Sequence, residues 1–241
     1  MDTIGFVGEP DHAVFWPVAE RLSARGFDVT FHRPTDPIRG DEVADLDALV
    51  NGVVHPEALA ALRHADRAGV PTWNGFAATT ALASRLVTLD ALATVGCRVP
   101  DVRFDGPAEG YDPGSRFAWD GGPTLDRSAP FYVERVRSEP VDHRYYAVDD
   151  GRETHMRALQ IRTAVADDDP LVTDTDVNVR LAARVRELLD GLSARAVGVD
   201  FTRADDGEFY AVRATPVPSF AGANMHRRVA DSVASLTTIG A

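Results

Sequence analysis

Apolar residues in the first third of the chain alternate between short continuous runs and segments with helical spacing. Val14, Val18 and Leu22 follow one another at intervals of four, which places them on one face of a helix. Strands are predicted at residues 3–7, 28–32, 47–50 and 70–73, and helices at residues 13–25 and 56–68. Strands that alternate with helices predict a small parallel α/β unit.

The pattern changes after residue 74. Residues 106–130 are dense in glycine, proline and aspartate, which is typical of a loop or a poorly packed hairpin. Strands are predicted at residues 102–104, 131–136, 144–148, 155–161, 196–201 and 209–214, and helices at residues 77–95 and 174–192. Turns such as Asp205-Asp206-Gly207 join successive strands, so this part of the chain is expected to form antiparallel sheets.

The charge of the chain narrows the range of partners. All 25 basic residues are arginine, 37 residues are acidic, and the net charge is −12. A negative surface repels phosphate backbones, so nucleic-acid binding through a basic face is not expected. Acidity without lysine favours a halophilic protein, because concentrated salt screens charge repulsion over a distance of about 3 Å.

Other residue patterns exclude several classes of site. Cys97 is the single cysteine and cannot form an internal disulfide, and the seven histidines share no metal-ligand spacing. No apolar run approaches the roughly 18 residues that span a bilayer, and the first residues lack a basic segment before their short apolar run. We therefore expect a cytoplasmic protein without a membrane partner.

Four segments carry a pattern of particular residues in a particular order. They are residues 69–74 (GVPTWN) followed by Ser84-Arg85, residues 96–100 (GCRVP), residues 131–135 (FYVER) with 142–146 (DHRYY), and residues 198–201 (GVDF) with 210–218 (YAVRATPVP). In this order the chain resembles the ATP-grasp family, specifically its glutathione-synthetase-like, RimK-type ligases. The resemblance implies a mixed α/β and α+β fold. A parallel preATP-grasp domain (1–75) would be followed by a shortened ATP-grasp domain (76–241) with a small lobe (76–136) and a large lobe (137–241).

The resemblance also implies a chemistry and a set of site residues. Such ligases use ATP and Mg²⁺ to activate a carboxylate as an acylphosphate, which an amine then attacks, so they need cations near the phosphates and oxygen ligands for the metal. The corresponding candidates are Arg144 and Arg213 as catalytic residues, Arg85, Glu134, Arg135 and Thr215 as nucleotide-binding residues, and Asp200 as the metal ligand.

The chain departs from the family pattern at the residues that matter most for catalysis. Arg213 and Thr215 stand where the pattern has a glutamate and an asparagine that hold the metal, so only Asp200 remains. A guanidinium cannot ligate Mg²⁺. No lysine is present to bind phosphate, and Asp120-Gly121-Gly122 is the nearest remnant of a glycine-rich loop. These departures indicate a degenerate site at which binding of ATP and Mg²⁺ is doubtful.

Several alternatives stay open at the level of single residues. Asp200 is either a surviving metal ligand or, as we favour, the partner of Arg213 in an ion pair. Arg144 either holds a substrate carboxylate or lies on an exposed strand face. Glu134 either faces an adenine or is a solvated residue of an edge strand.

Three functions remain compatible with the sequence. The first is a non-catalytic or weakly nucleotide-binding relative of carboxylate-amine ligases. The second is an active ATP-dependent ligase that uses arginine in place of lysine, and the third is an α/β small-ligand-binding or scaffold module. The expected partner is a small carboxylate or nucleotide, or a protein, and a homodimer is possible.

Overall fold

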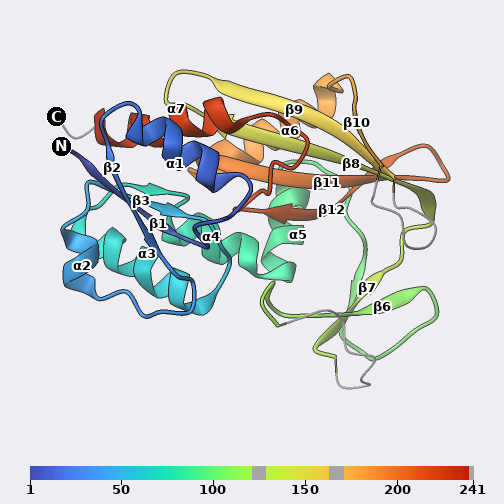
Figure 1. Ribbon diagram of the computed structural model, residues 1–241. Coiled ribbons are helices and arrows are strands. Elements are labelled where there is room, and N and C mark those ends of the chain that lie inside the picture. The colour runs from blue at the N-terminus through green and yellow to red at the C-terminus, as the bar shows by residue number, and fades with distance from the viewer. Residues whose placement is uncertain (121–128, 163–170, 239–241) are drawn as a thin grey trace.

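Three sheets organise the chain (Figure 1). The computed structural model describes residues 1–120, 129–162 and 171–238, which form a four-stranded, a three-stranded and a five-stranded sheet. The four-stranded sheet is parallel and comes first, and both later sheets are antiparallel. The predicted fold class, a parallel α/β unit followed by antiparallel sheets, is confirmed.

The parallel sheet contains β1 (Thr3–Val7), β2 (Asp28–His32), β3 (Ala48–Asn51) and β4 (Thr72–Trp73) in the order β2-β1-β3-β4. Helix α1 (Phe15–Ser23) covers one face, and α2 (Gly40–Ala44) and α3 (Pro56–Ala68) cover the other. Local residues set the limits of α3: the His55 ring accepts a hydrogen bond from the Glu57 amide, and Gly69 ends the helix at a φ of 73°. The predicted strands and helices of this region are present, and α2 is an addition.

The C-terminal helix α7 (His226–Thr238) returns to this first sheet. The sequence analysis made no prediction for this segment, although Val229, Val233 and Leu236 have helical spacing. These side chains pack beside α1 and against the inner face of the five-stranded sheet, in one core that also contains Ile4 and Tyr146. The first and last parts of the chain therefore share a core.

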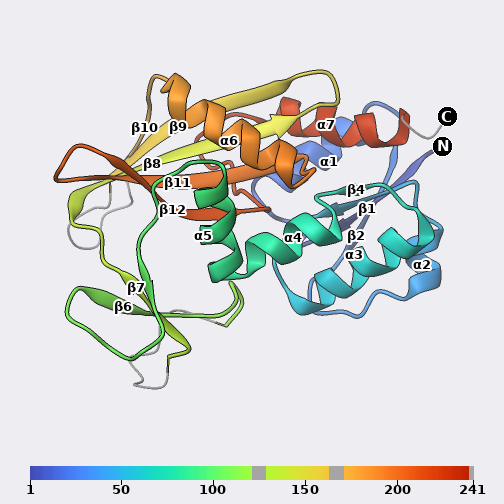
Figure 2. The same ribbon diagram turned by 180° about the vertical axis from the view of Figure 1, so that it is seen from behind.

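The large antiparallel sheet contains β8 (Ser138–Asp149), β9 (Thr154–Arg162), β10 (Leu171–Asp174), β11 (Ala196–Ala204) and β12 (Phe209–Thr215) in the order β10-β9-β8-β11-β12. Helix α6 (Val179–Gly191) covers the face opposite α7 (Figure 2). The predicted helix at residues 174–192 began too early, because Asn178 caps it by accepting hydrogen bonds from the amides of Arg180 and Leu181.

The small antiparallel sheet contains β5 (Val102–Arg103), β6 (Tyr111–Gly114) and β7 (Phe131–Glu134) in the order β5-β7-β6. Strand β6 lies within the stretch that was predicted to be a loop or a poorly packed hairpin, and residues 111–114 follow the second alternative, because β6 pairs antiparallel with β7. Glycine and proline in β6 hid it, since both are depleted in strands. Residues 121–122 of the predicted glycine-rich remnant lie outside the described residues.

The predicted helix at residues 77–95 is two helices, α4 (Phe76–Ala83) and α5 (Arg85–Thr94). The break at Ser84 arises because residues 116–118 run alongside it. The amide of Arg85 donates to the Arg116 carbonyl at 3.1 Å, and the amide of Ala118 donates to the Ala83 carbonyl at 2.9 Å. These long-range bonds replace helical ones and set the position of Arg85.

A buried side chain, Asn74, joins the end of β4 to the large sheet. Its amide nitrogen donates to the carbonyls of Ala196 (2.7 Å) and Pro216 (2.5 Å), and its oxygen accepts from the amides of Arg195 (2.6 Å) and Ala196 (3.0 Å). The parallel unit and the large sheet are thus held in one arrangement. The division of the chain into domains at residues 75 and 136 stays a prediction.

None of the helices in the described ranges is long and apolar enough to cross a membrane.

Candidate functional site

Two cavities that share Arg213 lie at the large sheet, and the larger one extends to the small sheet and the α4–α5 junction. The larger, of about 450 Å³, is lined by Arg85, Glu134 and Arg213, and the smaller, of about 150 Å³, by Arg144, Asp200, Arg213 and Thr215. Arg213 lines both. Six of the seven residues predicted from the sequence therefore meet here, brought together from α5, β7, β8, β11 and β12.

Asp200 is paired with Arg144 on the neighbouring strand β8. The Nε atom of Arg144 lies 2.5 Å from Oδ1 of Asp200 and the Nη2 atom 3.0 Å from Oδ2, so both carboxylate oxygens accept a hydrogen bond. This bidentate contact raises the pKa of Arg144. The predicted pair between Asp200 and Arg213 was wrong: both arginines are cross-strand neighbours of Asp200, and the register alone does not choose between them.

Arg85 and Arg213 have no acidic partner among the described residues. Arg85 is partly buried at the start of α5, whereas Arg213 is exposed on β12. Burial, together with the positive charge of Arg213, lowers the pKa of Arg85. Two guanidinium groups therefore line the same cavity, and neither is hydrogen-bonded to an acidic side chain of the described residues.

Two acidic side chains, Glu134 and Asp112, also line the larger cavity, and of these Asp112 is paired with an arginine. Glu134 accepts a hydrogen bond from the amide of Asp101 at 3.0 Å. Asp112 pairs with Arg135 through two hydrogen bonds, one of them 3.1 Å long, and these contacts lower the pKa of Asp112. Arg135 points its guanidinium to this exposed pair and lines neither of the two cavities, so the structure does not bring it together with the other predicted residues.

The residues at the expected metal position do not form a site for Mg²⁺. Both oxygens of Asp200 are held by Arg144. The hydroxyl of Thr215 accepts from the Val217 amide at 3.2 Å and donates to the Val217 carbonyl at 3.3 Å, which closes a turn after β12. Mg²⁺ requires oxygen ligands in a near-octahedral arrangement, and Arg213 offers a cation there instead. The donor set does not fit the metal.

The sequence analysis did not single out Phe117, which also lines the larger cavity. Its ring stacks on Trp119 with centroids 4.7 Å apart and an interplanar angle of 10°. Asp120 accepts a hydrogen bond from the Phe117 amide at 3.0 Å. These residues belong to an irregular segment without hydrophobic periodicity, so no signal in the sequence could have placed them at the site.

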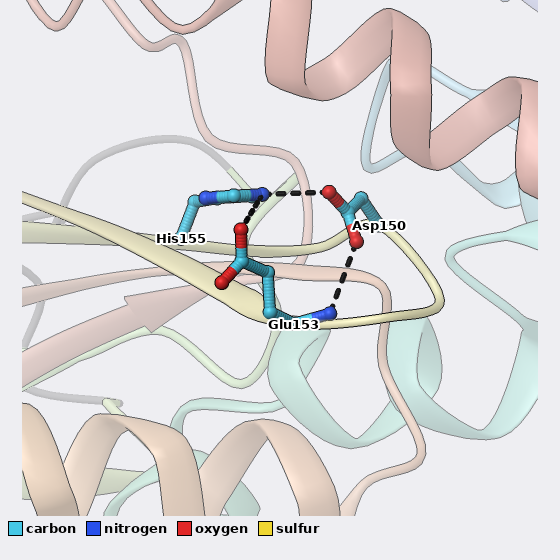
Figure 3. Close-up of side chains that lie close together, drawn as sticks. All are labelled: Asp150, Glu153 and His155. Atoms are coloured by element: carbon cyan, nitrogen blue, oxygen red, sulfur yellow. Dashed lines mark hydrogen bonds and ion pairs between the residues drawn. The ribbon is translucent and has the colours of Figure 1, made fainter.

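A separate cluster lies at the turn between β8 and β9 (Figure 3). The Nε2 atom of His155 is 2.6 Å from Oδ2 of Asp150 and 3.6 Å from Oε1 of Glu153. Oδ1 of Asp150 also accepts hydrogen bonds from the amides of Arg152 and Glu153. Although burial acts in the opposite direction, the bonds from His155 and the two amides lower the pKa of Asp150 to about 2. The cluster fixes the hairpin and lies outside both cavities.

No protein-family model and no curated protein sequence matches the chain. Solved structures do match. The ATP-grasp ligase PsnB, complexed with a minimal precursor, superposes with a TM-score of 0.72 at 17% identity, over 98% of this chain and 100% of that chain. The chain has the fold of the ATP-grasp ligases.

Two further structures support this conclusion. N5-carboxyaminoimidazole synthetase from Staphylococcus aureus matches with a TM-score of 0.74 at 12% identity, over 98% of this chain and 77% of that one. The macrocyclase MdnC from Microcystis aeruginosa MRC, bound with the precursor peptide MdnA, matches with a TM-score of 0.67 at 12% identity, over 99% of this chain and 100% of that one. At these identities the similarity establishes the fold alone.

Proposed function

We propose that this ATP-grasp protein binds an anionic ligand, a nucleotide or a small carboxylate, in the larger cavity and does not catalyse ATP-dependent ligation. One observation carries the proposal: Arg85 and Arg213 line the same cavity and neither has an acidic partner in the described part of the chain. RimK-like ancestry, inferred from the four sequence segments, accounts for the position of this cavity between the sheets.

The energetics of the empty cavity favour a bound anion. A partly buried guanidinium is stable only when it is hydrogen-bonded and balanced, and a second like charge beside it adds repulsion. A phosphate or carboxylate accepts two parallel hydrogen bonds from a guanidinium, and such charge-assisted pairs are among the strong polar contacts in proteins. A cavity of about 450 Å³ also lies within the size range of small-molecule sites.

The ligand for the first binding test is chosen from a structural neighbour. PsnB has been solved with Mg and ADP. ADP carries two phosphate groups that match two guanidinium groups, so it is the nucleotide with which binding to this chain is best tested. The absence of ligase activity in this proposal is supported by the donor set, in which both oxygens of Asp200 accept hydrogen bonds from Arg144 and the Thr215 hydroxyl is engaged with Val217.

An active ligase that uses arginine in place of lysine is the second candidate. It is favoured by the position of Arg85, which lies on the cavity where the family pattern has a cation on a helix. The two candidates differ in turnover. The proposal predicts no nucleotide-dependent release of phosphate with any acid and amine pair, whereas an active ligase releases ADP and phosphate as it forms an amide.

Binding is tested by thermal unfolding with increasing ADP, in potassium chloride and without metal. We expect stabilisation of about 2.7 kcal/mol when the ligand reaches a hundred times its Kd. Arg85→Ala and Arg213→Ala are each expected to raise the Kd about tenfold or more, because each removes a charge-assisted contact. Arg63→Ala is the matched control, since Arg63 is an exposed arginine of α3 that lines neither cavity.

Two results of these measurements would contradict the proposal. A melting temperature that does not respond to ADP, phosphate or small carboxylates means that the cavity is not an anion site. Equal affinity in Arg213→Ala and wild type means that the anion binds elsewhere.

A further inference from the structure

Positive charge occupies the place in this fold where a metal would meet the ligand. Arg213 lines both cavities, Arg85 lines the larger one, and Arg144 covers both oxygens of Asp200 at 2.5 and 3.0 Å. Three guanidinium groups thus surround the boundary between the cavities. Among the described acidic side chains that line the two cavities, Asp112 and Asp200 are each paired with an arginine, and Glu134 accepts a hydrogen bond from the backbone amide of Asp101.

From this arrangement we infer that the cleft selects a metal-free anion and rejects the same anion when it is complexed with Mg²⁺. Arg85 and Arg213 supply the positive charge that a metal supplies elsewhere in such chemistry. The inference rests on the proposed function, since it names the form of the ligand that the same cavity takes.

The selectivity has two physical causes. A magnesium ion on the phosphates would lie close to Arg213 without any protein oxygen to coordinate it, and like charges a few ångströms apart repel strongly at the effective dielectric constant of a protein surface. The metal would also occupy the phosphate oxygens that a planar guanidinium needs for bidentate hydrogen bonds. Both effects weaken binding of the complex relative to the free anion.

The test is a calorimetric titration of the full chain with ADP, first with EDTA and then at increasing MgCl₂, with potassium chloride adjusted to hold ionic strength constant. We expect the affinity for total ADP to fall as magnesium rises, while the affinity calculated for metal-free ADP stays constant. This is the behaviour of a protein that binds free ADP alone.

The other outcomes of this titration contradict either the selectivity against magnesium or the anion site itself. If magnesium strengthens binding, or if the complex binds as well as free ADP, the inference is wrong and the anion site stands. If ADP binds under neither condition, the proposed function fails and the inference fails with it.

Variants at the boundary test the cause of the selectivity. Arg213→Gln removes the charge and is expected to reduce the preference for free over complexed ADP about tenfold or more, because the repulsion is lost.

The double substitution Arg144→Ala with Arg213→Glu frees both oxygens of Asp200 and adds a carboxylate opposite it, so magnesium is expected to strengthen ADP binding in that variant. Arg213→Glu alone, at an exposed position, covers the case in which the double variant does not fold. An unchanged preference in Arg213→Gln and in Arg213→Glu would contradict the assigned role of Arg213.

Discussion

Asp200 illustrates how one side chain decides the chemistry of the site. Its side chain is 14% exposed and that of Arg144 28%, so the pair is largely withdrawn from water. Each oxygen of this carboxylate accepts a hydrogen bond from the same guanidinium, which satisfies part of its capacity as an acceptor. Sequence reasoning favoured an ion pair for Asp200 over a metal ligand but assigned it the wrong arginine, because β11 lies between β8 and β12 and has an arginine on either side.

The substitution Arg144→Ala tests how much the ion pair between Arg144 and Asp200 contributes to the free energy of unfolding. We expect the free energy of unfolding to fall by about 2 kcal/mol, since the substitution leaves a partly buried carboxylate unpaired. Arg144→Ala combined with Asp200→Ala should recover part of that loss, because no unpaired charge remains. Urea denaturation of the two variants and the wild type measures both values. A single variant as stable as the wild type would mean that the pair contributes nothing.

The ionisation of Asp150, at the turn between β8 and β9, is expected to make the stability of the folded chain depend on pH. Its pKa falls from an ordinary value of 3.8 to about 2 in the folded chain. A lowered folded-state pKa gives stability that is complete above 3.8 and is lost as the pH falls through this window to about 2. We expect Asp150→Asn to lose up to about 2 kcal/mol at neutral pH and to show a weaker dependence of stability on pH in this window. The same acid dependence in the variant and the wild type would assign it to other carboxylates.

At the scale of elements, the site depends on contacts between segments far apart in the chain. Ser84 interrupts a continuous helical pattern because residues 116–118 form backbone hydrogen bonds with the chain on either side of it. Without that contact, Arg85 would lie within a longer helix. Helical periodicity is a local signal, so it could predict helix at residues 77–95 but not the break.

Asn74 and Asn178 allow a matched comparison of two substitutions. Asn74→Ala removes four buried hydrogen bonds between β4 and the large sheet and leaves their backbone partners unsatisfied. We expect it to cost about 3 kcal/mol or more, whereas Asn178→Ala removes an exposed helix cap and should cost about 1 kcal/mol. Chemical denaturation of both variants measures the difference. Similar losses would contradict the role of Asn74 in joining the two parts.

At the scale of the whole molecule, net charge is the dominant feature. A chain of charge −12 without lysine repels itself when it folds, and salt reduces that repulsion. We propose on this basis that the protein is adapted to concentrated salt.

Thermal unfolding in potassium chloride from 0.1 to 1 M tests the adaptation, as the Debye length falls from about 10 Å to about 3 Å over this range. We expect the melting temperature to rise by several degrees, and to rise more than in sucrose of matched osmolarity, which favours compact states without screening charge. A melting temperature that is flat or falls with salt would remove the argument for halophily.

The sequence by itself determined the elements of the parallel unit apart from α2, most strands of the large sheet, the net charge and the absence of lysine. These are properties of composition or of neighbouring residues, and a helix or strand is signalled within a few positions. The resemblance between four short segments and the ATP-grasp family gave the fold, which the solved structures support.

Only the tertiary structure decided which arginine holds Asp200, that Arg85 and Arg213 line the larger cavity without an acidic partner among the described residues, and how the cavities adjoin at Arg213. It also decided that α7 packs beside α1 and that a helix breaks at Ser84. Each of these depends on contacts between residues distant in the chain, and the free energies of such contacts compete with one another. Hydrophobic periodicity does not record the outcome of that competition, because it reports only which face of a segment is buried.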